Sequence, residues 1–345
     1  MRPSLSRPLL ALFASLVLLS TGCIDFEKQT IVVAFNPDRD EAHVLLVYED
    51  MNPGGNTEDD LKNAKETLDL FFAQGKGFEL AHPWVTIYLV PPEEKKDPNE
   101  FDKKMIPHLI KHLTVKKGTC FINKDGRLCG TQTITVRGAK KFVQGLNDFI
   151  SETVGKEAEK KLADRTKRGG EDEETLRLWQ KAARDKHAWF SFEPGQVKLT
   201  LVGSSKYAAE IKRDLAKDLF LRQLRQALAP RPEKDAPPGA PPKAPTPEQL
   251  AKNRHQLREM ERWAELIATV PWSVEQKRDR LSLAIGLPDG GPLRLFSPYA
   301  TEKPGMKAEE MIAHAKKLGL TFQKDATVES VIADFLRKHP PAKPK

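Results

Sequence analysis

A proline-rich segment, Pro230 to Pro247, limits the fold of this 345-residue chain more than any other feature. Proline has no backbone N–H and its ring clashes with the preceding helical turn, so such a segment neither pairs in a sheet nor continues a helix. We therefore expect an exposed, semi-rigid spacer over residues 230–247. After it, Thr246 as N-cap and Pro247 at the first position predict a helix that runs to about Thr269.

Pairs of predicted strands, each followed by a helix, recur along the chain. The first pair covers residues 30–35 and 43–48, rich in β-branched and aromatic residues, with a turn between them and a helix over 57–73. Thr57, with Asp60 three residues later, resembles a capping box at the start of this helix. The same order is found at strands 118–122 and 128–136 with a helix from about 139, at strands 189–192 and 196–202 with a helix over 205–228, and at strands 281–287 and 293–296 with a helix near 307–318.

This order predicts an α+β fold made of antiparallel β-hairpins that are each followed by a helix, with up to four ββα units. The alternative is that these units are not a true repeat, because hairpins followed by helices are common in α+β proteins. A charged helical hairpin over 151–186, with Leu162, Leu176 and Trp179 facing inward, separates the second unit from the third.

The spacer divides the predicted fold into two lobes. We expect an N-terminal α+β domain over 23–229, the linker 230–247, a small C-terminal α+β lobe over 248–339 and a basic tail over 340–345. Within the C-terminal lobe, the predicted helix should bury Trp263 and Leu266 against Leu283 and Ile285.

The first 22 residues have the composition of a signal peptide. Arg2 and Arg7 form a basic lead, Leu9 to Leu19 is apolar, and small residues follow. The apolar run is about half of the ~20 residues that a membrane-spanning helix requires.

The end of this segment, Leu-Ser-Thr-Gly-Cys at residues 19–23, resembles the lipobox of bacterial lipoproteins. It differs from the usual pattern at Ser20, where leucine is commoner. The resemblance implies cleavage before Cys23, a lipid on the Cys23 thiol and acylation of the new amine. The protein should then lie in the cell envelope, anchored by lipid to a bacterial membrane and facing outside the cytoplasm; the alternative is an ordinary cleaved signal with a chance cysteine.

The charge of the chain favours an anionic surface as partner. The chain has 56 Lys and Arg and 48 Asp and Glu, which gives a net charge of +8. Removal of Arg2 and Arg7 with the first 22 residues lowers this net charge by two. A mild positive charge spread along the sequence fits anionic lipid headgroups or wall polymers. We expect no nucleic acid partner, because an exported protein rarely meets one.

The motifs that could hold a metal or a phosphate have unfavourable settings. His108 and His112 share a helical face, but Pro107 should disrupt the helix before them and no third ligand is nearby. Asp38, Asp40 and Glu41 lack the spacing of a calcium loop and are interpreted as an acidic turn. We expect no metal and no cofactor.

Two loops join a predicted strand to a predicted helix, the position at which phosphate-binding loops and nucleophilic serines occur. The loop 52–55 is surrounded by acidic residues that would repel a phosphate, so nucleotide binding is rejected. In the loop 203–206, Ser204 or Ser205 is interpreted as a helix N-cap rather than a nucleophile. No residue is assigned a catalytic role.

Cys120 and Cys129 lie on either side of the turn Lys124-Asp125-Gly126. A three-residue turn closing at Gly126 pairs Phe121 with Cys129 and points the thiols to opposite faces. A register shifted by one residue puts them on the same face, where a disulfide would form. Export favours the disulfide and the turn chemistry opposes it, so both alternatives stay open.

Three functions are consistent with these features. The first is a non-catalytic envelope lipoprotein that binds or scaffolds an envelope protein or wall polymer. The second is an extracytoplasmic hydrolase with dispersed carboxylate acid/base residues. The third, a ligand-capturing lipoprotein of a transporter, needs two balanced lobes, whereas the break at Pro230 is too near the C-terminus. A deep cleft with two buried carboxylates would favour the hydrolase, and flat faces the binding protein.

Overall fold

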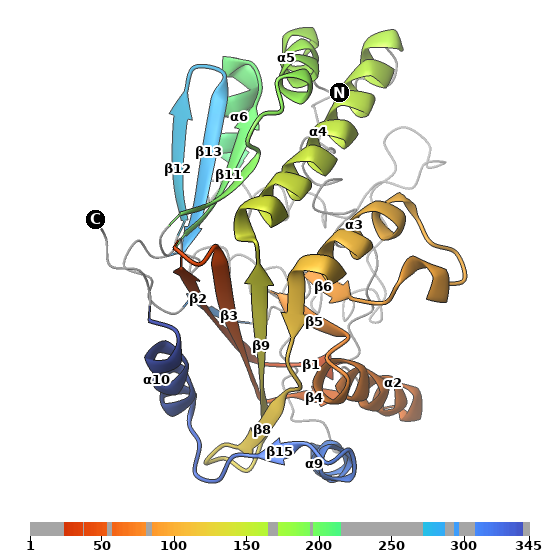
Figure 1. Ribbon diagram of the computed structural model, residues 1–345, viewed down its shortest axis with the longest axis vertical. Coiled ribbons are helices and arrows are strands. Elements are labelled where there is room, and N and C mark those ends of the chain that lie inside the picture. The colour runs from red at the N-terminus through yellow and green to blue at the C-terminus, as the bar shows by residue number, and fades with distance from the viewer. Residues whose placement is uncertain are drawn as a thin grey trace, which may run out of the picture.

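The computed structural model describes residues 24–36, 38–53, 57–80, 85–164, 172–193, 196–214, 272–286, 293–296 and 308–340. Within these residues the protein is a mixed α+β structure, as the sequence predicts, with two larger sheets and helices packed against them (Figure 1). Residues 1–23, the proline-rich segment and the predicted helix with Trp263 and Leu266 lie outside the described residues.

The largest sheet has seven strands in the order β14-β2-β3-β9-β8-β15, and β7 also pairs with β9. Its strands are β2 (Lys28–Asn36), β3 (Glu41–Glu49), β7 (Leu113–Val115), β8 (Thr119–Ile122), β9 (Leu128–Arg137), β14 (Leu293–Phe296) and β15 (Thr321–Phe322). The β2–β3 hairpin is closed by Asn36, whose Oδ1 accepts the backbone N–H groups of Asp38 and Arg39 at 3.1 Å each. This local bond is the reason that asparagine favours turns.

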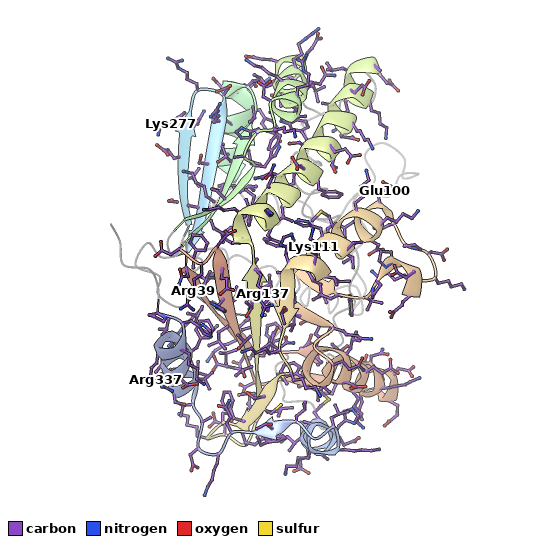
Figure 2. All side chains as sticks on the ribbon, viewed as in Figure 1. Arg39, Glu100, Lys111, Arg137, Lys277 and Arg337 are labelled. Carbon is purple, nitrogen blue, oxygen red and sulfur yellow. The ribbon has the colours of Figure 1, made fainter. Side chains whose placement is uncertain are left out.

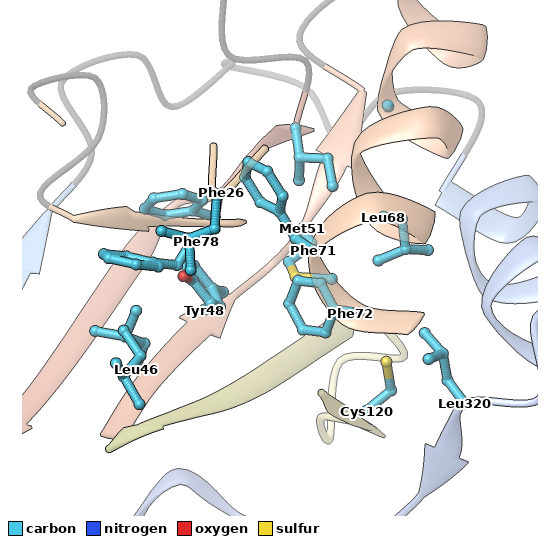
Figure 3. Close-up of a cluster of buried hydrophobic side chains, with 14 of the residues drawn as sticks. Phe26, Leu46, Tyr48, Met51, Leu68, Phe71, Phe72, Phe78, Cys120 and Leu320 are labelled. Carbon is cyan, nitrogen blue, oxygen red and sulfur yellow. The ribbon is translucent and has the colours of Figure 1, made fainter. Parts of the chain in front are cut away.

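The main core lies between one face of this sheet and three helices. These are α2 (Glu58–Leu68), which continues into the π-helical turn η1 (Asp69–Ala73), α3 (Glu100–His112) and α9 (Ala308–Lys317). Figure 3 shows Tyr48 in this core together with Phe26 and Phe72. The ring centroid of Tyr48 lies 5.1 Å from that of Phe26 and 5.7 Å from that of Phe72. The predicted cap of α2 is confirmed, because Thr57 and Asp60 form a reciprocal capping box.

The opposite face of the sheet is covered by the C-terminal helix α10 (Val328–Lys338). Val331, Ile332 and Phe335 pack there against a cluster of strand residues from β2, β3, β8 and β9, namely Val32, Ala34, Leu45, Val47, Phe121 and Cys129. At the end of α10, the ring of His339 stacks on that of His43 with centroids 4.0 Å apart. Charged side chains such as Arg337 on α10 lie on the outside of the molecule (Figure 2).

The second sheet has four strands in the order β10-β11-β13-β12. Its strands are β10 (Phe190–Glu193), β11 (Gln196–Val202), β12 (Trp272–Lys277) and β13 (Arg280–Gly286). The helices that pack with this sheet are α4 (Ala139–Ala163), α5 (Glu173–Arg184) and α6 (Ser205–Asp214). The predicted inward positions of the helical pair are confirmed for Leu176 and Trp179, which are buried, and Leu162 packs at the edge of the same cluster. Trp179 Nε1 donates to the carbonyl of Val202 at 2.6 Å and so ties α5 to β11.

The short elements complete the fold. They are β1 (Ile24–Asp25) paired with β4 (Asn52–Pro53), β5 (Gly77–Leu80) paired with β6 (Val85–Tyr88), and the 3₁₀ turn η2 (Pro92–Glu94). The β5–β6 hairpin is fastened to the large sheet by buried polar side chains. Gln132 Nε2 donates to the carbonyls of Phe71 and Gly77 at 2.9 and 3.0 Å, and Gln29 Nε2 donates to that of Glu79 at 2.7 Å.

The predicted hairpins are found in part. β2 pairs with β3, β8 with β9 and β10 with β11, all antiparallel. The fourth hairpin is wrong: β13 pairs with β11 and β12, whereas β14 pairs with β2 in the other sheet. The hairpin partner of β13 is β12, which precedes it in the sequence, rather than the predicted strand that follows it. That the chain contains up to four ββα units stays a prediction.

The described part of the C-terminal segment contributes strands to both larger sheets. Residues 272–340 add β13 to β11 and β12 to β13, β14 to β2, β15 to β8 and α10 to the face of the large sheet. The reason is physical, because isolated hairpins are marginally stable and these strands complete sheets begun by the N-terminal half.

No helix in the described part of the chain is both long and apolar enough to span a bilayer.

Candidate functional site

A groove lies where the two sheets meet, between the first half of α4 and strand β10. It has a volume of about 420 Å³, within the range of roughly 300–1,000 Å³ that is usual for ligand pockets. It is lined by Phe35, Ala139, Lys140, Val143, Gln144, Asn147, Asp148, Lys186, Ala188, Ser191 and Phe192. Sites between structural layers are common places for ligands, so we take this groove as the candidate binding site.

The groove follows from the helical period of α4. Ala139, Val143 and Asn147 recur every four residues and therefore face one side of the helix, toward β10. Phe35 at the end of β2 and Phe192 in β10 stack across the junction, with ring centroids 6.3 Å apart and planes at 28°. The walls are thus aliphatic and aromatic, with charged side chains at the rim.

Asn147 connects the two walls by bonding the backbone of β10. Its Oδ1 accepts the N–H of Phe190 at 2.7 Å, and its Nδ2 donates to the carbonyl of Phe190 at 2.9 Å. A single side chain thus satisfies both backbone groups of one residue at the edge of the sheet. This amide fixes the distance between α4 and β10 and so holds the groove open.

A second open groove continues along α4 toward α5. Its volume is about 690 Å³, and it shares Asp148 and Lys186 with the first. Gly155 lets the helices approach closely, since a Cβ there would lie 3.1 Å from that of Ala183. A long ligand could therefore extend from Phe35 along the length of α4.

A pair of carboxyl groups forms the main electrostatic cluster outside this groove. Arg127 Nη1 contacts Glu27 Oε2 at 3.3 Å and Asp50 Oδ2 at 3.1 Å, and Asn123 Nδ2 donates to Asp50 Oδ1 at 2.7 Å. A hydrogen bond with Asp50, together with partial burial and the charge of Asp50, raises the pKa of Glu27 above its usual value. Asp50 has a left-handed backbone with φ of 58°, which is uncommon outside glycine.

The side chains of Cys120 and Cys129 lie on opposite faces of the large sheet. Of the two registers left open by the sequence, the structure has the one in which Phe121 pairs with Cys129. Cys120 therefore belongs to the core under α2, and Cys129 to the cluster under α10. Both are buried free thiols, so the alternative of a Cys120–Cys129 disulfide is not the one formed, and burial raises both pKa values to about 12. Such thiols are unreactive.

His108 and His112 hold α3 against the start of α4. The nitrogen Nε2 of His108 lies 3.0 Å from the Phe142 carbonyl, and Nδ1 of His112 lies 2.8 Å from that of Arg137. The prediction that Pro107 disrupts the helix was wrong, because Pro107 lies inside α3. The cost of a proline within a helix is offset by the apolar side of α3, which is buried in the core.

The acidic turn and the serine loop both cap helices. Asp40 accepts Lys140 N–H on its Oδ1 and Ala139 N–H on its carbonyl, both at 2.9 Å, so it caps α4 from a distant part of the chain. The interpretation of Ser204 as an N-cap is confirmed: its Oγ accepts Tyr207 N–H at 3.1 Å and donates to Asp172 at 2.6 Å. Ser204 is therefore engaged structurally.

No group of three or more His, Cys, Asp or Glu side chains in the described ranges has the arrangement of a metal site. The loop 52–55 is described only at Asn52 and Pro53, which form β4, and Cys23 lies outside the described residues.

Sequence reasoning missed both the groove along α4 and the Glu27–Asp50 pair. Their members lie far apart in the sequence, and no short motif contains them. The one local signal was the spacing of Ala139, Val143 and Asn147 on a predicted helix, which indicates a helical face but not what lies opposite it.

Comparison with known proteins does not extend these findings: no known protein family, no curated protein and no solved structure matches the chain.

Proposed function

We propose that this chain is a lipid-anchored protein of the bacterial cell envelope that binds or scaffolds another envelope component without catalysis. The observation that carries the proposal is the position of Ile24, the residue directly after the lipobox-type Cys23. Ile24 belongs to strand β1 and is 4% exposed, so it is part of the folded body. The sequence alone placed the first strand near Thr30, so ordered structure lies closer to Cys23 than expected.

A body that begins directly after a lipidated cysteine has no tether and must lie against the membrane surface. Two or more acyl chains hold a protein stably where one holds it only marginally. The net charge of +8 for the whole chain, which becomes +6 (54 Lys and Arg against 48 Asp and Glu) once Arg2 and Arg7 are removed, supports contact with anionic headgroups or wall polymers. The protein would then present its grooves to components close to the membrane.

The shape of the described surface supports binding rather than catalysis. Three depressions on the described surface are open grooves, and none of the three is lined by a carboxyl group from the buried set Asp25, Glu79 and Asp102. The Asp102 carboxylate instead accepts the backbone N–H of the N-cap Asn99 in the capping box of α3 and pairs with Lys95 at 2.5 Å. A hydrolase of the expected kind would place paired carboxyl groups in a cleft.

The anchor is tested with the Cys23→Ser variant, expressed in a bacterium that processes lipoproteins and supplied with labelled palmitate. The wild-type chain should take up label and sediment with membranes, and the variant should be unlabelled and soluble. A variant that still sediments, together with an unlabelled wild-type chain, would contradict the proposal. Cys129→Ser, which changes a buried cysteine outside the lipobox, is the matched control and should be labelled like wild type.

One observation favours the hydrolase as a second candidate. Glu27 and Asp50 form a carboxyl pair with a raised pKa on Glu27, the arrangement in which one group donates a proton while the other stays ionised. Glu27→Gln and Asp50→Asn should each abolish any hydrolysis of chromogenic esters, glycosides or phosphoesters by the purified chain. Absence of activity in the wild-type chain, or activity that both variants retain, removes this candidate.

A further inference from the structure

We propose that the groove between α4 and β10 binds an extended, acidic polypeptide segment of a protein partner, which adds as a strand to the free edge of β10. This proposal rests on the proposed binding function and names its partner class. It does not depend on the lipid anchor.

The backbone of β10 offers the hydrogen bonds for an added strand. Strand β10 stands at the end of the four-stranded sheet, and no described strand pairs with its outer edge. In an antiparallel pair, successive residues bond alternately toward the partner strand and away from it. The N–H of Thr200 donates to the carbonyl of Trp189. The backbone N–H and C=O groups of Trp189 and Ser191 are therefore directed toward β11, and those of Phe190 and Phe192 are directed away from it.

Asn147 already occupies one of the two outward positions. Its amide bonds both backbone groups of Phe190, as a residue of an added strand would do. Phe192 is the next outward residue, and Ser191 and Phe192 line the groove. A segment entering the groove would thus continue the pairing that Asn147 begins, and main-chain bonds to a sheet edge are a common mode of peptide recognition.

The side chains around this edge select an apolar residue in the segment. Phe35 and Phe192 form one wall, and Val143 on α4 forms the other. All three are partly exposed, so a large apolar side chain inserted between them would remove their remaining surface from water. Aromatic walls of this kind anchor many protein interfaces.

The charges at the rim select an acidic residue. Lys140 and Lys186 are exposed at the two sides of the groove, and neither forms an ion pair with a carboxylate in the described part of the chain. Asp148 lies in the same lining, so the local charge is positive by one. An acidic residue flanking the apolar one would meet Lys140 or Lys186, and a basic residue would be repelled.

The second edge of the same sheet lacks this combination. Strand β12 forms that edge, and none of the three grooves includes a residue of β12. Edges of this kind are normally protected against pairing. Among the described residues, the side chain of Asn147 bonds the outer edge of β10, and it does so at Phe190 rather than at Phe192.

The experiment is selection of a random nonapeptide phage library on the full chain, purified in detergent and immobilised. Enriched peptides should combine aromatic or large aliphatic residues with Asp or Glu. Binding of the synthetic peptides is then measured by fluorescence polarisation. N-methylation of the peptide backbone should weaken binding at alternate positions only, because an added strand directs every second N–H toward β10.

The decisive variants change charge on the exposed rim and leave the core intact. Lys140→Glu and Lys186→Glu should each weaken binding about tenfold, the effect of losing roughly 1.4 kcal/mol. Lys141→Glu, the adjacent exposed lysine on α4 outside the groove, is the matched control and should bind as wild type. No enriched peptide, equal weakening by Lys141→Glu, or N-methyl effects without alternation would each overturn the proposal.

Discussion

Replacing Phe335 by alanine should destabilise the whole described body. Phe335 lies in α10, near the C-terminus, and is 5% exposed against the second face of the large sheet. The strands beneath it include Val32 of β2 and Leu45 of β3, which belong to the first hairpin of the chain. A defect at Phe335 therefore acts on contacts between the two ends of the sequence.

The size of the effect follows from burial. Removing a buried phenylalanine costs about 3–5 kcal/mol, and the lower value applies here because a surface helix relaxes into the space more easily than an internal one. For a body of this size, each kcal/mol lowers the melting midpoint by roughly 2–4 °C. We therefore expect a loss of about 3 kcal/mol and a fall of roughly 6–12 °C.

The assay is differential scanning calorimetry of the purified chain, with Arg337→Ala as control. Arg337 is on the same helix with 74% of its side chain exposed, and its pair with Asp334 is a surface ion pair of about 0–1 kcal/mol. Phe335→Ala should shift one cooperative transition downward, and Arg337→Ala should not. Two separate transitions, of which only the smaller moves, would refute the reasoning and restore an independent C-terminal lobe.

Three further predictions follow from the described contacts. A fragment of residues 246–345 should be unfolded by circular dichroism, because its strands pair with strands it lacks; a cooperative melt would contradict the observed sheet order. Cys120 and Cys129 should resist iodoacetamide at pH 8 and both react in guanidinium without reductant, and failure to react there would reveal a disulfide. Ser204→Ala should cost about 1–2 kcal/mol in denaturant melts and the exposed Ser205→Ala less than about half of that; equal effects would remove the cap assignment.

Where a structural feature depends on residues close together in the sequence, the prediction succeeded. Gly126 takes the left-handed φ of 76° that a three-residue turn needs, and this turn places Phe121 opposite Cys129. The N-caps at Thr57 and Ser204 were likewise visible, because a cap bonds N–H groups two or three residues away.

Predictions failed for strand pairs whose two strands are far apart in the sequence. The sequence favoured pairing β13 with β14, yet β14 lies beside β2 and β13 beside β11. The backbone groups of an edge strand are chemically alike, so local sequence does not identify the strand that will pair with them. The choice is made by which arrangement buries the apolar faces of both sheets at once.

The sequence by itself therefore determined the α+β class, the turn at Gly126 and the helix caps, all of which arise from interactions over a few residues. Only the tertiary structure decided that residues 272–340 complete both sheets, that Asp40 caps α4, that Glu27 meets Asp50, and that α4 lies along β10 to form a groove. The physical reason is that strand partners and site residues from distant segments are selected by the joint burial of apolar surface, a property of the whole chain.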